Sequence, residues 1–381
     1  MRVATTILVF CVGALLALGM VMLFSAKMMH ESAAWQPMAQ VVWCGLGLIA
    51  GAIAIAVDYR KLKKFAIPLL VLAVVLLLMV FIPDLGRSIN GAYRWIKLPK
   101  GLGGLTLQPS EMAKLALIIF MAYYCERFLR QMHTFKKGVM IPALVVGGVL
   151  GLIFIEPDVG TTMLLAAVCS IMLLLAGLRW RYFIPPVLIG CIAIGAFIYN
   201  DPMRSERIYA WLNLEETKRD KGAQAYQAKL ALGAGGLTGL GLGNGRQKLG
   251  FIPENHTDFI FSIVGEELGL IATIGVVLAF VMILFSGVFI ASRAPDMFGM
   301  LLASGITFMI SIQAFINIGV VTNFLPNKGM SLPFISYGGS NLLVMLCSIG
   351  LLLSVARQGV DRERTVERRN PFNDIPGAQE A

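Results

Sequence analysis

Long apolar stretches alternate with short polar segments along almost the whole chain. Ten of these stretches approach or exceed the roughly 17 to 25 residues that a helix needs to cross the hydrocarbon core of a bilayer. They cover residues 4–26, 37–57, 65–82, 109–127, 139–155, 159–177, 183–199, 259–290, 297–319 and 337–356. The pattern predicts an all-α, polytopic membrane protein with about ten transmembrane helices.

Three features of the pattern set the domain organisation. The first stretch follows Arg2 and is too long for the core of a signal peptide, so we expect an uncleaved helix. The stretch 259–290 is longer than a bilayer requires, so we expect it to tilt or to extend beyond the membrane. One long polar loop, 200–258, separates the seventh and eighth helices. We therefore expect a membrane domain over residues 1–357 and a disordered polar tail over 358–381.

Composition and charge support this class and fix the orientation. Hydrophobic residues make up 57% of the chain and charged residues 14%, which excludes an ordinary soluble domain. Lysine and arginine gather in the short loops on the side of Arg2, as in 60–64 and 127–137. By the positive-inside rule both termini are cytoplasmic and the loop 200–258 is extracytoplasmic. The net charge of +10 then reflects this rule and anionic lipid, and we expect no nucleic-acid partner.

The cysteines and histidines of the chain argue against disulfide bonds and against a structural zinc site. The six cysteines lie within or beside apolar stretches, so no disulfide framework is implied. Only three histidines are present, and no Cys/His pair has the spacing of zinc ligands.

Asp258 is the first candidate for chemistry. It ends the long loop directly before an apolar helix that begins at Phe259, and a carboxylate at a membrane boundary is costly to hold. A second interpretation stays open, because aspartate is also a favoured helix N-cap. His256 stands two residues before it. The glycines in 233–250 lack the Gly-Lys-Ser/Thr ending of a phosphate loop, so we interpret them as hinges or points of close backbone approach.

Cationic side chains accompany Asp258 on the predicted outer face. Arg94 lies in an outer loop, where arginine is unexpected, and a guanidinium group suits a phosphate or diphosphate ligand. Lys114 lies three residues after Glu111 at a helix start and points toward hydrocarbon, so it needs a partner or a water-filled cavity. Arg207 lies in the long loop.

Two further segments point to the same face. Glu156-Pro157-Asp158 joins two helices, and Pro and Asp there are also ordinary turn residues. The segment 323–340 combines prolines and glycines with many apolar residues, which suggests a re-entrant segment buried in protein. It would bring Lys328 and Ser336 toward the same outward cavity.

These strings, in this order, resemble the SEDS family of cell-wall polymerases (FtsW, RodA and SpoVE). The resemblance covers about residues 5–357 and rests on the strings at 91–96, 108–114, 157–161, 253–261, 265–269 and 333–340. Residues 243–249 and 328–329 look more like the division branch, FtsW, than the elongation branch, RodA. Glu156 departs from the pattern, where glutamine is expected, as do Asn255 and Asn341. The 97–107 loop is longer than in the family pattern and rich in glycine, so we expect it to change how the outer loop that carries Arg94 packs.

The resemblance implies an inverting glycosyltransferase that polymerises lipid II into peptidoglycan at the outer face of the bacterial cytoplasmic membrane. We assign Asp258 as the base that accepts the acceptor hydroxyl's proton, or as a ligand of Mg²⁺ or Mn²⁺ that activates this hydroxyl. The cations Arg94, Lys114, Arg207 and Lys328 would then bind diphosphate.

The remaining site residues have supporting roles in this hypothesis. Glu111 would orient Lys114, while Asp158, His256 and Ser336 would shape the cavity. The resemblance also implies a class B penicillin-binding protein as partner, together with other division proteins, and a location at the septum.

Two other functional classes stay open from the residues. A lipid II flippase or other transporter would also use charged residues and discontinuous helices, although its polar clusters belong at the midplane and not on one face. A non-catalytic division scaffold would tolerate neutralisation of Asp258.

Overall fold

The computed structural model describes residues 1–27, 35–82, 85–89, 92–97, 106–246 and 257–368. Within these ranges the chain is a helical bundle with one small sheet. Its longer helices are α1 (Arg2–Lys27), α2 (Trp35–Ala56), α3 (Leu62–Met79), α4 (Pro109–Arg127), α5 (Ile141–Ile155), α6 (Val159–Leu175), α7 (Trp180–Asn200), α11 (Ile260–Ser292), α12 (Met297–Val321) and α13 (Gly339–Arg368). These ten helices coincide with the ten apolar stretches.

Eight helices in the described part of the chain are long and apolar enough to cross a membrane. The two expected spans outside this set are α6, a shorter apolar helix, and α4, which carries four charged side chains. The prediction that the chain is a polytopic, all-α membrane protein is therefore confirmed. Glu111 and Lys114 near the start of α4 are buried, so neighbouring helices, and not lipid, surround these two charges, whereas Glu126 is partly buried and Arg127 is exposed at the end of the helix.

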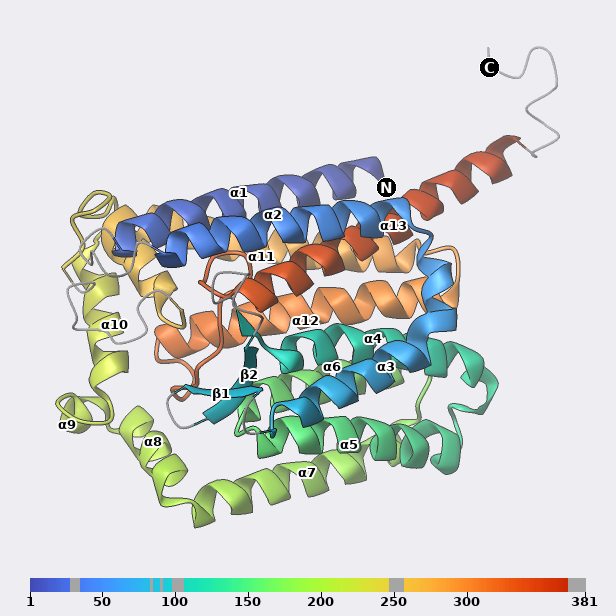
Figure 1. Cartoon of the computed structure of the whole chain (residues 1–381), viewed down its shortest axis with the longest axis horizontal. Helices are drawn as coiled ribbons and strands as arrows, with labels where there is room; N and C mark the ends of the chain where they lie inside the picture. The colour runs from blue at the N-terminus through green and yellow to red at the C-terminus, as the bar shows by residue number, and fades with distance from the viewer. Residues whose placement is uncertain (28–34, 83–84, 90–91, 98–105, 247–256, 369–381) are drawn as a thin grey trace.

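The bundle has two polar ends (Figure 1). The N-terminus and the end of α13 lie at one end, and the small sheet and helices α8 (Pro202–Leu212), α9 (Leu214–Thr217) and α10 (Ala223–Ala234) lie at the opposite end. Helix α12 packs against α4, α6, α11 and α13 near the centre of the bundle. The arrangement agrees with the predicted topology, in which both termini share one side and the long loop lies on the other.

The long loop is folded, which its polarity alone did not predict. It forms α8 (Pro202–Leu212), α9 (Leu214–Thr217) and α10 (Ala223–Ala234). Trp211 Nε1 donates to the carbonyl of Asn323 at 3.0 Å, and Asn327 Nδ2 donates to Gln224 Oε1 at 3.2 Å. These two contacts fasten the loop helices to the segment that follows α12.

The glycine-rich segment after α10 explains the excessive length of α11. Gly269 breaks that helix with φ 77° and ψ −172°. At the break, Leu270 N donates to the Gly236 carbonyl, while Gly241 N donates to the Glu267 carbonyl. A Cβ built on Gly239 would lie 2.2 Å from the Glu267 carbonyl oxygen. The prediction of close-approach glycines is confirmed, and the extra length of α11 belongs to a separate outer segment before Gly269.

The small sheet lies in the outer loop between α3 and α4. Strands β1 (Gly86–Ile89) and β2 (Ala92–Lys97) pair antiparallel, and β3 (Thr106–Leu107) pairs with β2. Ser340 Oγ receives a hydrogen bond from Gln108 N at 3.0 Å, which fastens the end of this sheet to the start of α13.

The segment between α12 and α13 is buried, as expected for a re-entrant segment. Its side chains Met330, Leu332, Phe334 and Ile335 are all less than a tenth exposed. Gln40 of α2 holds it by donating to the Ser336 carbonyl and accepting from Gly338 N, both at 3.3 Å. Buried backbone groups are thereby satisfied inside the protein, as a membrane interior demands.

The boundary of the polar tail needs correction. Residues 358–368 were expected to be disordered, but they continue α13 to Arg368. Arginine and glutamate are good helix formers, and extending an existing helix avoids the cost of nucleation. Residues 369–381 lie outside the described ranges.

Candidate functional site

Asp258 lies two residues before the start of α11 and is partly exposed at the outer end of the bundle. The helix begins at Ile260 with Phe259 in the N-cap position. The interpretation of Asp258 as the helix N-cap is therefore wrong. Its backbone carbonyl accepts a hydrogen bond from Asn317 Nδ2 at 2.8 Å, so α12 fixes the position of this residue.

Three residues after α12 connect Asp258 to helix α6. A Cβ built on Gly329 would lie 2.5 Å from Asp258 Oδ2, and Asn317 Nδ2 also donates to the Met330 carbonyl at 2.6 Å. On the other side, a Cβ built on Gly160 would lie 3.0 Å from Met330 Cγ and 3.3 Å from Lys328 Cε. Segment 328–330 thus lies between the Asp258 carboxylate and the N-terminus of α6.

Lys328 is a half-buried cation beside α6. Its Nζ lies 3.2 Å from the sulfur of Met163, a weak hydrogen-bond acceptor. Burial lowers the pKa of Lys328 to about 8, with Arg204 and Arg207 acting in the same direction and Asp158 opposing them. Arg204 and Arg207 therefore lie near enough to Lys328 for their charges to act on it, and such a group of cations favours an anionic ligand.

The turn before α6 carries two carboxyl groups with different surroundings. Asp158 is the N-cap of α6, because its Oδ1 accepts from Thr161 N at 3.1 Å and its Oδ2 accepts from Thr161 Oγ1 at 2.8 Å. Arg94 donates to the carbonyls of Glu156 at 2.9 Å and Pro157 at 2.7 Å. The sheet therefore brings Arg94 to the same turn, and its guanidinium binds backbone there.

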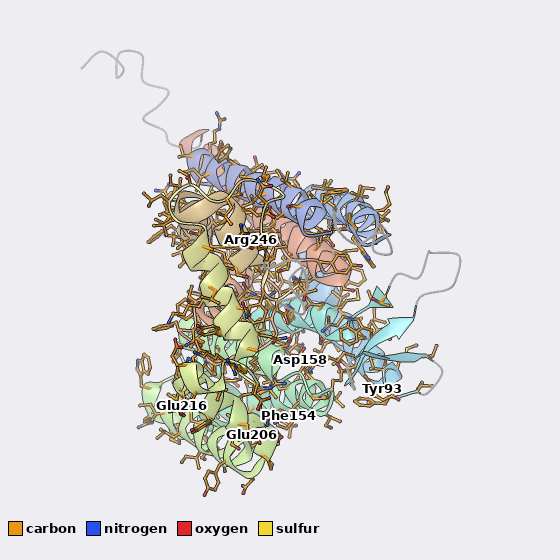
Figure 2. The ribbon with its side chains drawn as sticks, turned by 90° about the vertical axis from the view of Figure 1, so that its left-hand side faces the viewer. Tyr93, Phe154, Asp158, Glu206, Glu216 and Arg246 are labelled. Atoms are coloured by element: carbon orange, nitrogen blue, oxygen red, sulfur yellow. The ribbon has the colours of Figure 1, made fainter. Side chains whose placement is uncertain are left out.

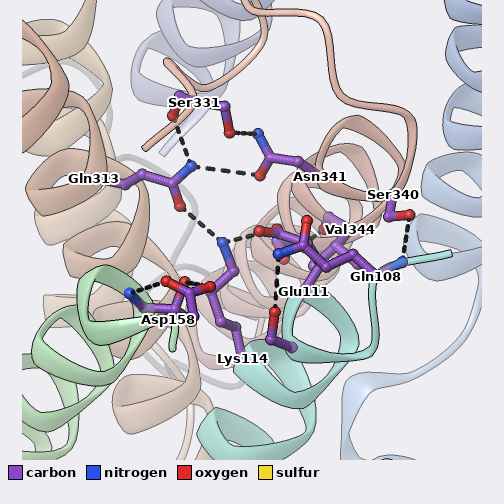
Figure 3. Close-up of polar contacts among 12 residues, drawn as sticks. Gln108, Glu111, Lys114, Asp158, Gln313, Ser331, Ser340, Asn341 and Val344 are labelled. Atoms are coloured by element: carbon purple, nitrogen blue, oxygen red, sulfur yellow. Dashed lines mark hydrogen bonds and ion pairs between the residues drawn. The ribbon is translucent and has the colours of Figure 1, made fainter. Parts of the chain in front are cut away.

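Glu111 and Lys114 form a buried ion pair, as their spacing on a helix predicted. Their charged atoms are 2.7 Å apart, and the two residues are 5% and 1% exposed. Lys114 Nζ also donates to Gln313 Oε1 at 2.9 Å, and Gln313 Nε2 donates to the Ser331 carbonyl at 2.9 Å (Figure 3). Lys114 is thus connected through Gln313 to the buried segment that carries Lys328.

Ser336 faces the protein interior. Its hydroxyl donates to the Thr257 carbonyl at 2.6 Å and accepts from Leu332 N at 2.7 Å. The hydroxyl therefore holds the residue next to Asp258 against the buried segment. A direct contact between Ser336 and a ligand stays a prediction.

Of the two remaining predicted site residues, the structure describes only one. Arg207 lies on α8 with an exposed side chain, and His256 lies outside the described residues. In the side view, Asp158 lies between the sheet that carries Tyr93 and the loop helices that carry Glu206 and Glu216 (Figure 2). The predicted cations on β2, α8 and segment 328–330 thus surround one region of the outer end.

Sequence reasoning missed several polar residues that support the site. Gln313 and Asn317 are each 1% exposed and link α12 to segment 328–331. The sequence signal that could have identified them is a pair of amides four residues apart in an otherwise apolar helix.

The sequence analysis included Glu266 and Glu267 only as part of the family string at 265–269. Their carboxylates accept from Arg246 N at 2.7 Å and Gly243 N at 3.1 Å, which holds the glycine-rich segment on α11.

The described residues offer a limited set of metal ligands. Within this part of the chain, no three His, Cys, Asp or Glu side chains lie together in a way that could hold a metal ion. Magnesium is often bound by only one or two carboxylates together with substrate phosphates and water. A partly exposed Asp258 near a candidate phosphate site fits such a shared arrangement.

Comparison with known families extends over nearly the whole chain. Residues 5–360 match the FtsW/RodA/SpoVE family model, described as "Cell cycle protein". A curated protein of Geobacter metallireducens is 42% identical over 349 residues, covering 90% of this chain and 92% of its own. That protein is called "Probable peptidoglycan glycosyltransferase FtsW".

Solved structures show the same fold. A chain from work described as "Structural coordination of polymerization and crosslinking by a peptidoglycan synthase complex" superposes with a TM-score of 0.77 at 29% identity. The match covers 92% of this chain and 97% of that one. The rod shape determining protein RodA of Thermus thermophilus superposes with a TM-score of 0.68 at 29% identity, covering 92% and 96% of the two chains.

Proposed function

Because the chain belongs to the FtsW/RodA/SpoVE family of cell cycle proteins, we propose that it is a peptidoglycan glycosyltransferase that polymerises lipid II at the outer face of the cytoplasmic membrane. The observation that carries this proposal is the position of segment 328–330. It lies between the carboxylate of Asp258 and the N-terminus of α6, and its Lys328 is close enough to Arg204 and Arg207 of α8 for their charges to act on it. An acid and an anion site on two sides of one short segment suit transfer of a sugar from a lipid diphosphate.

The chemical step needs a proton acceptor and an anion site. The acceptor sugar hydroxyl attacks the anomeric carbon of the donor, forms the new C–O bond and loses its proton to Asp258. The bond between the anomeric carbon and the diphosphate oxygen breaks, and the electron pair leaves with the diphosphate. Cations placed at that oxygen stabilise the charge that develops on it.

The cations divide into two groups by their surroundings. Lys328 and Arg207 lie nearest to an open anion site, because Lys328 is half-buried beside α6 and Arg207 is exposed on α8. Lys114 is deeply buried and already paired with Glu111 and Gln313. We therefore assign direct diphosphate contacts to the first group and to the partly exposed Arg94. Lys114 acts through Gln313 on the position of segment 328–331.

A divalent cation is an extension of the same proposal. Asp258 would hold Mg²⁺ or Mn²⁺ together with the diphosphate, and the ion would supply Lewis-acid stabilisation of the phosphate charge. The chain's own residues position the acceptor hydroxyl and hold its proton at Asp258. Dependence of the rate on metal distinguishes a shared ion from a carboxylate that acts by itself.

The test is glycan polymerisation from labelled lipid II by purified wild-type protein and Asp258→Asn, with and without Mg²⁺ or Mn²⁺. Removing a general base lowers rates by about a hundred- to ten-thousand-fold. We expect polymer from the wild type and at most trace polymer from the variant, with the same thermal unfolding temperature for both. Equal polymer from both proteins would remove Asp258 from the chemistry.

The same experiment separates the other functional classes. Polymer from neither protein, even with a cognate partner present, would favour a lipid II flippase or transporter. Normal cell division by a strain that carries Asp258→Asn would favour a scaffold.

A partner and a location accompany the proposal. The matched solved chain comes from a complex that coordinates polymerization and crosslinking. We therefore propose that this protein acts with a class B penicillin-binding protein that cross-links the new strand. The names of the curated relatives further support a role in division, and so a location at the septum together with other division proteins.

A further inference from the structure

The turn between α5 and α6 contains a buried carboxyl group that the proposed chemistry leaves unused. Glu156 is 1% exposed, and neither of its carboxyl oxygens has a hydrogen-bond partner among the described residues. Buried polar groups in native proteins nearly always have a partner. The described residues around the turn do not supply a partner, so the burial of this carboxyl group needs an explanation.

Two charged side chains near the Glu156 carboxyl group, Arg94 and Asp158, make their hydrogen bonds elsewhere. Arg94 donates to the backbone carbonyls of Glu156 and Pro157, and not to the carboxyl group. Both oxygens of Asp158 accept from Thr161. Asp158 also places a second carboxylate close to Glu156, which opposes ionisation of the latter.

These surroundings favour the protonated form of Glu156. An ionised carboxylate without a donor is costly inside a protein, whereas a neutral carboxyl group is tolerated. Burial raises the pKa of Glu156 to about 8, Asp158 adds to the rise, and Arg94 opposes it. At neutral pH the side chain therefore carries an O–H group that can donate a hydrogen bond.

The turn lies within the cationic region already described. Lys328 lies against Gly160 in the first turn of α6, and the charges of Arg204 and Arg207 on α8 act on Lys328. Arg204 is itself paired with Asp201 at 3.1 Å and lies over the ring of Phe197. Among the described residues, Arg94 is the cation whose charge acts on Glu156 itself, and a neutral donor beside it adds a hydrogen bond to an anion without adding negative charge.

We propose that Glu156 is a binding residue of the donor site, and that its protonated carboxyl group donates a hydrogen bond to a phosphate oxygen of the lipid diphosphate beside Arg94 and Lys328. The inference rests on the proposed function, because that function supplies the diphosphate. It assigns to Glu156 a role opposite to that of Asp258, which holds a proton only after it has accepted one from the acceptor sugar.

The first test is equilibrium binding of undecaprenyl diphosphate to the purified full-length protein in detergent at pH 7. Glu156→Gln keeps a neutral donor of the same length, and we expect its dissociation constant to stay within about twofold of the wild type. Glu156→Leu removes the donor, and we expect binding weaker by about tenfold or more. The control is Glu215→Gln on the loop helices, where the side chain is 67% exposed, and we expect no change.

The second test is the pH dependence of the same binding. Above about pH 8 the wild type loses the Glu156 proton and the Lys328 charge, so affinity falls with two ionisations. Glu156→Gln retains only the Lys328 ionisation, so its affinity falls less steeply. A merely structural glutamate would leave the two profiles superimposed.

Several outcomes would overturn the inference: wild-type affinity in Glu156→Leu, equal losses in the glutamine and leucine variants, or superimposed pH profiles. Should the leucine variant fail to fold, the pH profile of Glu156→Gln decides by itself. Polymerisation measured on the same preparations separates the two proposals. Diphosphate binding that depends on Glu156 without any polymer would contradict the proposed function alone, and polymer without that dependence would contradict the inference alone.

Discussion

The backbone of Gly329 lies directly against the carboxylate of Asp258, so closely that a Cβ at position 329 would stand 2.5 Å from Oδ2. The two residues are 71 positions apart in the sequence, and Asn317 fixes both sides of the contact by donating to the carbonyls of Asp258 and Met330. The position of the proposed base is therefore set by the segment that also carries Lys328.

Gly329→Ala is expected to impair catalysis more than folding. The added methyl group would push the Asp258 carboxylate aside, and misplacing a catalytic group by about 1 Å can cost about a hundredfold in rate. We expect kcat for glycan polymerisation to fall by about tenfold or more, with an unfolding temperature near that of the wild type. The matched control is Gly147→Ala in α5, where a Cβ meets no atom within 4 Å. A Gly329→Ala enzyme with normal kcat would show that this contact does not position the base.

Lys114→Met is expected to destabilise the fold because it leaves the Glu111 carboxylate buried without its cation. Breaking a buried ion pair on one side costs about 3–5 kcal/mol of unfolding free energy. The double variant Glu111→Gln with Lys114→Met should recover most of this loss. Unfolding in mixed micelles measures both effects. Lys218→Met provides the control, since Lys218 and Glu215 form an exposed pair at 3.7 Å and we expect a change of less than about 1 kcal/mol.

Lys328 is expected to make donor binding dependent on pH. Its pKa is lowered to about 8 by burial, so its charge is lost as pH rises through that value. The apparent KM for lipid II should rise above about pH 8 in the wild type, and less in Lys328→Arg, because arginine stays protonated. An arginine variant with the same pH profile as the wild type would assign the effect to another group.

Lys328 should also make folding stability depend on pH, but with the opposite sign to donor binding, so that stability increases as pH rises. Its pKa is lower in the folded chain than the ordinary value of 10.5, so the unfolded chain binds more protons between about pH 8 and that value. The contribution of Lys328 to stability therefore increases with pH across this window. Comparing the unfolding free energies of the wild type and Lys328→Arg at pH 7.5 and 10 isolates it.

Gly239→Ala is expected to detach the glycine-rich segment from α11. Gly239 has φ 82°, and a Cβ there would lie 2.2 Å from the Glu267 carbonyl oxygen. The left-handed conformation alone costs about 1–2 kcal/mol for alanine, and the clash adds to this. Thermal unfolding measures the loss. Gly233→Ala, in open space on helix α10, should be neutral or stabilising by up to about 1 kcal/mol. Equal stability of the two variants would contradict the role of close approach at Gly239.

The helices and one ion pair could be predicted because both depend on neighbours in sequence. An apolar stretch long enough for a bilayer must form a helix to satisfy its own backbone, wherever it packs. Likewise, Glu111 and Lys114 are three residues apart on one helix, so their contact follows from helical geometry. Polar turns between these helices also indicated which end of the bundle carries the site.

The supporting residues could not be predicted in the same way. Gln313 and Asn317 act on a segment that only the packing of α12 brings near, and their amide side chains carry no charge that would distinguish them. At the break in α11 at Gly269, the Gly236 carbonyl accepts a hydrogen bond from Leu270 N and Gly241 N donates to the Glu267 carbonyl, and both glycines belong to another segment. Hydropathy alone therefore gave one continuous helix where the structure has two parts.

The sequence by itself determined the class, the topology and the candidate status of Asp258, because hydrophobic length, charge bias and a carboxylate at a membrane edge are local properties. Only the tertiary structure decided that Asp258 lies against Gly329, that Arg94 binds the turn before α6, and that Glu156 is buried there without a donor among the described residues. Each of these facts depends on how segments that are remote in sequence pack against one another. Burial and partner geometry, which set the protonation state of a carboxyl group, exist only once those segments have packed together.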